Sequence, residues 1–83
     1  MSHWQYRLDV KDLWLDYDPG RFEQVRNEIV RRIESSSFWD ATDFQLIDVV
    51  EALAGSENVF EFNQWWDDFY DWADDHRVWV ATF

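Results

Sequence analysis

The chain has 83 residues, a net charge of −11 and no cysteine, and 47% of its residues are hydrophobic. This length predicts one globular domain over residues 1–83, and the lack of cysteine excludes a disulfide framework and a thiolate metal site. No apolar run approaches the ~20 residues of a membrane span, and the N-terminal residues lack the apolar segment of a signal peptide. We therefore expect a folded, soluble, cytoplasmic protein.

The negative charge is concentrated in one part of the chain. Residues 1–33 carry six acidic and six basic side chains, whereas residues 34–76 carry twelve acidic side chains and no Lys or Arg. Such a region repels phosphate, which disfavours direct binding to nucleic acid or to an anionic membrane. The charge distribution favours a basic partner instead.

The first predicted element is a strand. Residues 4–10 alternate apolar and polar side chains, with Trp4 at the start, which is the pattern of a half-buried strand. Residues 13–17 follow with a mixed pattern, and we expect a short turn or helical segment there. Asp18 and Pro19 then predict a helix start, with Asp18 as the N-cap and Pro19 at the first helical position.

Two predicted helices follow, and residues 38–40 are expected to fill the core between them. The first keeps an apolar stripe to about Glu34 and ends at three serines. Thr42 opens a T-x-x-Q capping box that predicts the second helix, and a left-handed Gly55 would end it. The second helix is expected to bury five apolar side chains: Phe44, Leu46, Ile47, Val50 and Leu53.

A third helix is predicted over about residues 59–75. Asn58 begins an N-x-x-E sequence similar to a capping box, and a helix capped by Asn63 after a short extended piece is the alternative. Residues 77–83 are β-branched and aromatic, which predicts a second strand. The order β-α-α-α-β defines an α+β domain in which two terminal strands pair beside three helices.

The third helix separates into two faces when it is drawn at 100° per residue. One face is aromatic, and we expect its largest side chains to form the core: Trp65, Trp66, Phe69 and Trp72. The opposite face is anionic: Glu61, Asp67, Asp68, Asp71, Asp74 and Asp75.

Three of these acids, Asp67, Asp71 and Asp75, follow one another at intervals of four residues. Like charges at this spacing destabilise a helix by roughly 0.2–0.5 kcal/mol per pair, and acids in the last turn also oppose the helix dipole. Successive members lie about 6 Å apart along the helix, and phosphates along one DNA strand are separated by a similar distance, with roughly 3.4 Å of axial rise per nucleotide. The row therefore predicts a DNA-mimicking surface, with help from Glu57 and Glu61. A face that only keeps the protein soluble, and a basic partner of another kind, are the alternatives.

Few residues of this chain offer chemistry. His3 and His76 are the only histidines, and a metal site that combines His76 with Asp71, Asp74 and Asp75 is the enzymatic alternative. The serines lack a G-x-S-x-G context, and two glycines cannot build a phosphate-binding loop. We expect no cofactor, no resident metal and no enzymatic activity.

Two segments, YRLDVKDLW at residues 6–14 and FYDWADDHRVWVATF at residues 69–83, resemble small acidic proteins of bacteriophages, chiefly those of actinobacteria. The resemblance implies a phage or mobile-element origin and no specific activity. Small acidic proteins that block host nucleic-acid-binding machinery, including anti-CRISPR and anti-restriction DNA mimics, recur in that setting. The leading expectation is a non-enzymatic inhibitor that presents carboxylates to the basic surface of a nucleic-acid-binding host protein.

The alternative function is a structural or regulatory interaction module. Two terminal strands leave exposed edges, which favours homodimerisation by edge pairing. Seven tryptophans also exceed what a small core readily hides. One or two of three tryptophans are therefore expected to be exposed as interface anchors: Trp14, Trp39 and Trp79.

Overall fold

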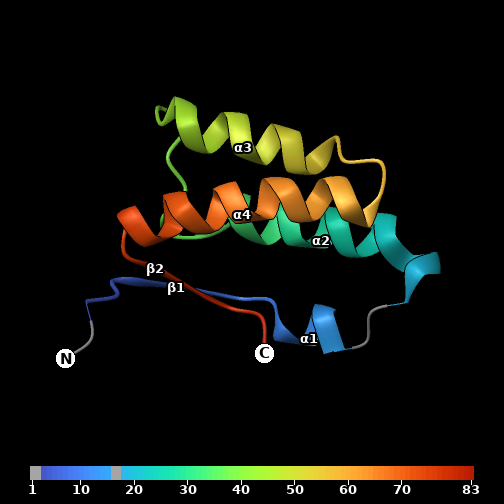
Figure 1. Ribbon diagram of the computed structural model, residues 1–83. Coiled ribbons are helices and arrows are strands. Elements are labelled where there is room, and N and C mark those ends of the chain that lie inside the picture. The colour runs from blue at the N-terminus through green and yellow to red at the C-terminus, as the bar shows by residue number, and fades with distance from the viewer. Residues whose placement is uncertain (1–2, 16–17) are drawn as a thin grey trace.

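The computed structural model describes residues 3–15 and 18–83. In chain order its elements are β1 (Tyr6–Asp9), α1 (Lys11–Leu15), α2 (Phe22–Glu34), α3 (Phe44–Ala54), α4 (Val59–Asp75) and β2 (Val78–Ala81). Helix α3 lies on one side of α4 and α2, and the two strands lie on the other side (Figure 1). The predicted α+β class and the β-α-α-α-β order are confirmed, with α1 as a short addition.

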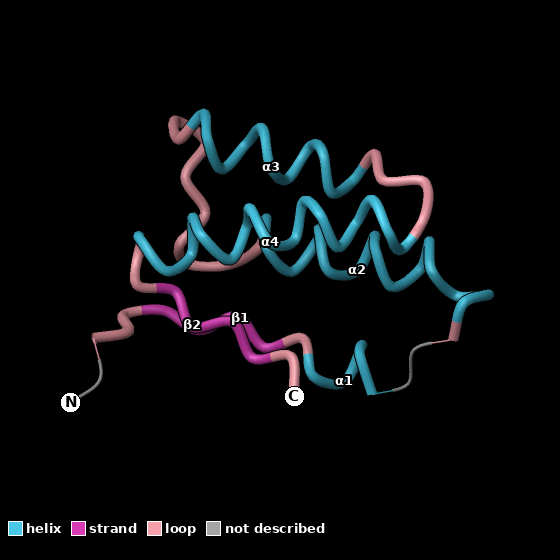
Figure 2. The backbone as a smooth tube through the Cα atoms, viewed as in Figure 1, coloured by secondary structure: helices cyan, strands magenta, loops and turns pink. Residues whose placement is uncertain are grey.

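The two strands come from opposite ends of the chain and pair in parallel. Tyr6 lies opposite Val78, and Asp9 lies opposite Ala81. Figure 2 shows the pair running side by side beneath α4. Parallel neighbours need a long crossover connection, and the three longer helices provide it here. The predicted pairing of the terminal strands is confirmed.

Both strands are shorter than their sequence patterns predict. Leu8 and Val10 are buried, but Trp4 and Tyr6, on the same side of the alternation, are exposed. At the other end of the chain, Arg77 has a φ of 59° and forms the turn from α4 into β2. Because this left-handed conformation is not compatible with a strand, β2 begins one residue later than predicted.

A bidentate ion pair connects helix α1 to the last turn of α2. Arg32 Nη1 and Nη2 donate to Asp12 Oδ1 and Oδ2 at 2.7 and 2.8 Å, and Nη1 also donates to the carbonyl of Asp9 at 3.0 Å. The hydrogen bonds from Arg32 lower the pKa of the Asp12 carboxyl to about 2. The helical alternative for residues 13–17 is thus confirmed up to Leu15, and Tyr17 lies outside the described residues.

Replacing Asp12 tests this ion pair through pH. A lowered pKa means that the charged carboxylate favours the folded state, so its stabilisation is complete above the ordinary pKa of 3.8 and disappears as the pH falls through about 2. We expect Asp12→Asn to lower the melting temperature modestly at pH 7, as is typical of an exposed pair, and to approach the unaltered protein as the pH falls below about 2. Thermal unfolding followed by circular dichroism from about pH 1 to pH 7 measures this. An offset that is independent of pH would contradict the ion pair.

The predicted helix start at Asp18 and Pro19 opens a 3₁₀ turn, whereas α2 itself begins at Phe22 after Arg21, which makes no side-chain cap. Asp18 Oδ1 accepts a hydrogen bond from the N–H of Gly20 at 2.8 Å and caps a 3₁₀ turn, Pro19–Arg21, that leads into α2. At the other end, the hydroxyls of Ser35 and Ser36 each donate to a backbone carbonyl of the last turns at 2.6 Å. The same two carbonyls, of Arg31 and Ile33, also accept the backbone N–H groups of Ser35 and Ser36, so each serine gives the end of α2 a second hydrogen bond and α2 ends without a glycine.

Helix α3 ends at Gly55 as predicted, but its N-cap residue and the conformation of Gly55 differ from the prediction. Its N-cap is Asp43, whose Oδ1 accepts from the N–H of Leu46 at 3.1 Å. Thr42 instead donates both its hydroxyl and its N–H to Asp40, so the T-x-x-Q pattern does not form the cap. Gly55 has a φ of −90° and is right-handed, so the prediction of a left-handed terminator was wrong.

The buried side of α3 also differs in two positions. Leu46, Val50 and Leu53 are buried as predicted, but Phe44 is 78% exposed and Ile47 is half-buried. Phe44 lies about 160° around the helix from Leu46, on the side away from the core. Val49, which the prediction omitted, is buried.

Helix α4 begins at Asn58, and the alternative start at Asn63 was wrong. Asn58 Oδ1 accepts from the N–H of Glu61 at 2.9 Å. In return, Glu61 Oε1 lies 3.4 Å from the N–H of Glu57 and from the side-chain amide of Asn58. This reciprocal arrangement is a variant of the capping box that the N-x-x-E spacing predicts, because Glu61 accepts from the N–H of Glu57 instead of the N–H of the N-cap Asn58.

A stack of aromatic rings follows the buried side of α4. Consecutive rings lie 4.1–6.0 Å apart at 13–26°, in the order Phe62, Trp66, Phe69, Trp72 and His76. Phe38 is buried against two of these rings, which confirms that the connector before α3 fills the core. We call this series the aromatic stack.

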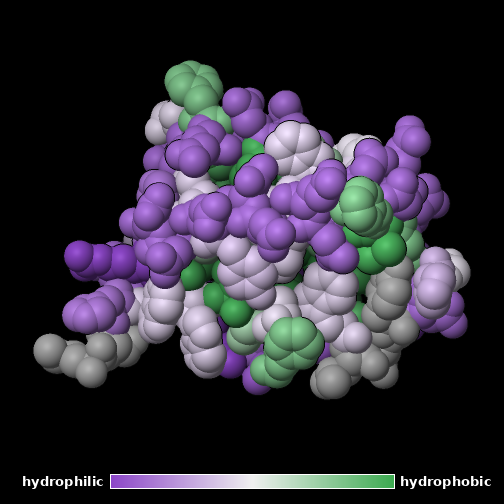
Figure 3. All heavy atoms as spheres, in the orientation of Figure 1, coloured by the Kyte–Doolittle hydropathy of each residue, from purple (hydrophilic) through white to green (hydrophobic). Residues whose placement is uncertain are grey.

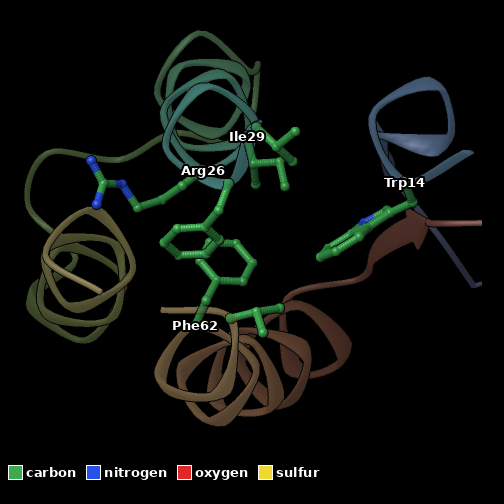
Figure 4. A pocket seen from close by; sticks show the side chains of 7 residues that line it. Trp14, Arg26, Ile29 and Phe62 are labelled. Carbon is green, nitrogen blue, oxygen red and sulfur yellow. The ribbon is translucent and has the colours of Figure 1, made fainter. Parts of the chain in front are cut away.

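The packing between α2 and α4 leaves only a small cavity of about 10 Å³. In Figure 4, Phe62 of α4 faces Ile29 of α2, and the Trp14 indole approaches from α1. Arg26 points away, and its Nη1 donates to the carbonyl of Ser56 at 2.7 Å. A space of this size holds at most about one water molecule, so the cavity is a packing gap and offers no room for a substrate.

Candidate partner-binding surface

Five aspartates line the outward side of α4, and all of them are exposed: Asp67, Asp68, Asp71, Asp74 and Asp75. We call this set the α4 acidic face. Figure 3 shows hydrophilic side chains as a band along α4, between pale and green apolar groups. The sequence predicted this arrangement because the opposite side of the same helix is aromatic.

The carboxylates of the α4 acidic face do not stabilise the fold through contacts with other side chains of the described residues. Across residues 3–15 and 18–83, none of its five carboxylates takes part in a side-chain hydrogen bond or an ion pair. Other acids do support the fold: Asp12 binds Arg32, Asp43 caps α3 and Glu61 completes a capping box. The charge on α4 is therefore uncompensated where it is densest.

The predicted site residues fall into two groups along α4. Asp67, Asp71 and Asp75 form a row with an axial spacing of about 6 Å, and the other two aspartates flank it. Glu57 and Glu61 lie at the opposite end, where Glu61 is engaged in the cap. Glu61 lies about 9 Å from Asp67 along the helix axis, so it extends the acidic surface without joining the row.

Helix α3 adds an acid that the predicted site omitted. Asp48 is exposed on α3, which packs beside α4, whereas Glu51 lies on the side of α3 near Glu34 of α2. Asp48 faces Asp68 and Asp71 across a groove of about 450 Å³ between α3 and α4. The position of Asp48 on the polar side of α3 was readable from the sequence, but its nearness to α4 follows only from how the helices pack.

Trp65 lies on this groove and corrects one prediction. The helical pattern places it in the core, yet it is 42% exposed, while Trp72 is buried. The groove walls include both indoles and Val49. An exposed indole beside carboxylates gives the acidic surface an apolar contact point.

The end of α4 is tied to the start of α3. Trp72 Nε1 donates to Asp43 Oδ2 at 3.0 Å, and His76 stacks on Trp72 with its Nε2 3.5 Å from the same carboxylate oxygen. His76 Nδ1 lies 2.8 Å from the carbonyl of Trp72, which fixes that nitrogen as a donor. Within the described part of the chain, no three His, Asp or Glu side chains are grouped to hold a metal ion, and His76 faces Asp43 instead of the α4 acidic face.

The remaining tryptophans divide between core and surface. Trp79 is exposed, as predicted for one or two of three candidates, and the Arg7 guanidinium lies 4.2 Å from its ring centre. Trp14 and Trp39 are half-buried against the core. Trp4 is also exposed, so the sheet carries aromatic surface of its own.

Comparisons with known proteins give no relative: no protein-family model matches the chain, and neither do the curated proteins or the solved structures. In the part of the chain that the structure describes, no helix has both the length and the apolar character needed to cross a membrane.

Proposed function

We propose that this protein is a non-enzymatic inhibitor that occupies the basic surface of a nucleic-acid-binding protein. The observation that carries the proposal is the α4 acidic face, which is exposed and has no partner within the described residues. Acids that neither cap a helix nor pair with a base oppose folding at this density, since each like-charged pair at i, i+4 costs roughly 0.2–0.5 kcal/mol. A basic partner would offset that cost.

The row of Asp67, Asp71 and Asp75 supports mimicry of nucleic acid. The separation of about 6 Å between its successive members resembles the distance between neighbouring phosphates on one DNA strand, although the axial rise of DNA is roughly 3.4 Å per nucleotide. The aromatic stack packs along the opposite side of α4, so the helix that carries the row is ordered before binding. A preorganised row of this kind suits a groove that normally tracks a phosphate backbone.

The proposal also includes the origin of the protein and the cell compartment in which it acts. The resemblance at the two ends of the chain favours a phage or mobile-element protein that acts in the host cytoplasm. Anti-CRISPR and anti-restriction proteins are the corresponding inhibitor types. Direct binding to nucleic acid or to an anionic membrane is disfavoured, because the acidic region repels phosphate.

A triple substitution, Asp67→Asn, Asp71→Asn and Asp75→Asn, tests the proposal. Removing two like-charged pairs should stabilise the protein by about 0.4–1 kcal/mol while it abolishes partner capture. The immobilised protein is incubated with an actinobacterial lysate at about 50 and about 300 mM salt, and capture should weaken steeply at the higher salt. The captured protein should be released by added duplex DNA.

A matched control separates this row from charge in general. Glu23→Gln, Glu34→Gln and Glu51→Gln remove the same charge from exposed positions on α2 and α3. This control should retain the partner. Equal capture by both triple variants, or a captured protein that DNA does not displace, would refute mimicry through α4.

A homodimer is the second candidate, and the sheet favours it. The described residues contain two strands, so each strand has one edge without a neighbouring strand. Such an edge is available for pairing with a second copy. Sedimentation that shows a dimer, and a monomer for Val80→Pro, would support this candidate. A monomer at all concentrations would oppose it.

A further inference from the structure

The groove between α3 and α4 combines an apolar wall with carboxylates. It has a volume of about 450 Å³, within the range of small-ligand sites, and six of its lining residues are Asp48, Val49, Trp65, Asp68, Asp71 and Trp72. Three of the six are acidic, and residues 34–76 contain no Lys or Arg. The groove therefore lacks a cation from its own walls.

The sheet has a comparable arrangement of an exposed indole beside a carboxylate, and an arginine side chain occupies it. On the sheet, the Arg7 guanidinium lies 4.2 Å from the ring centre of Trp79, and its Nη2 donates to Asp9 at 3.2 Å. Trp79 and Trp65 are almost equally exposed, at 43% and 42%. Among the described residues, guanidinium groups lie over Trp79 and Phe22, and Trp65 has none.

We infer that the α3–α4 groove receives an arginine side chain of the partner, with the guanidinium stacked on Trp65 and hydrogen-bonded to the carboxylates of Asp68 and Asp71. This inference rests on the proposed function and names the group that the groove recognises. A guanidinium is planar, weakly hydrated and able to stack while its N–H groups bind carboxylates. A lysine ammonium is a compact and strongly hydrated charge, so the indole gives arginine the advantage.

The test compares hexa-arginine with hexa-lysine, which carry equal charge. Binding of each peptide to the whole protein is measured by isothermal titration calorimetry. Hexa-arginine should bind roughly two- to fivefold more tightly, the advantage expected of an exposed cation–π contact. Trp65→Leu should remove this preference and leave hexa-lysine binding unchanged, while Trp79→Leu should leave the preference intact.

Two pairs of acid substitutions locate the contact. Asp68→Asn with Asp71→Asn removes two groove carboxylates and should abolish the preference for arginine. Asp67→Asn with Asp74→Asn removes the same charge from outside the groove and should weaken both peptides equally. In the unaltered protein, the indole N–H resonance of Trp65 should shift on addition of hexa-arginine more than that of Trp79, which tests the contact without any substitution.

The groove inference and the proposed function would fail in different experiments. Equal affinities for the two peptides, or a Trp65 resonance that does not move, would overturn the groove inference while leaving inhibition through the α4 acidic face intact. Failure of the proposed function would appear in the lysate capture instead, as a partner retained by the triple Asn variant.

Discussion

Phe69→Ala is expected to destabilise the protein by about 3–5 kcal/mol. Phe69 is fully buried at the centre of the aromatic stack, 5.1 Å from the ring of Trp66 and 6.0 Å from that of Trp72. Truncation removes both contacts and leaves a cavity that the neighbouring large rings cannot fill without leaving their rotamers. A domain of this size has roughly 4–12 kcal/mol of total stability, so a large share would be lost.

Phe44→Ala provides the matched control, because it removes the same atoms from an exposed position. Phe44 is on the outer side of α3, and the change should alter stability by no more than about 0.5 kcal/mol. Urea unfolding followed by circular dichroism measures both variants. Similar losses would mean that Phe44 lies in the core, as the sequence predicts for the second helix.

The second large effect is expected for Asp43→Ala. Asp43 accepts hydrogen bonds from the N–H of Leu46 and from the buried indole of Trp72. Loss of an N-cap costs about 0.5–2 kcal/mol, and an unpaired buried donor costs about 1–3 kcal/mol, so the combined loss should be about 1.5–5 kcal/mol. The same unfolding measurement applies.

Thr42→Ala distinguishes the cap that forms from the one that the sequence pattern names. Thr42 is exposed and bonds only to Asp40, so its replacement should cost less than about 1 kcal/mol. A loss as large as that of Asp43→Ala would place the N-cap at Thr42 and contradict the hydrogen bond to Leu46.

Most features of the fold that the sequence predicted correctly depend on residues that are close together in the chain. The caps at Asp18 and Asn58 fix helix starts because each depends on residues two or three positions away. The separation of α4 into aromatic and acidic sides depends only on helical periodicity, and the acidic face is exposed as expected. These features need no knowledge of the rest of the chain.

The prediction errors arise where the exposure of a residue depends on how neighbouring elements pack. Trp65 and Trp72 lie within about 20° of each other around α4, so periodicity treats them alike. Trp72 is covered because Asp43 and His76 close over the end of the helix, whereas the groove beside α3 leaves Trp65 exposed. Likewise, Asp48 joins the acidic surface only through the packing of α3 on α4.

The pairing of β1 with β2 constrains the order in which this protein can acquire its structure during synthesis. Paired residues such as Tyr6 and Val78 are 72 positions apart. While the chain is still emerging from the ribosome, the helices can begin to pack, but β1 has no partner until residues 78–81 have left the exit tunnel. Completion of the sheet is therefore a late, non-local step, and loop closure over such a distance is slow compared with local helix formation. A nascent chain cut short before Val78 would expose the unpaired edge and the buried side of β1.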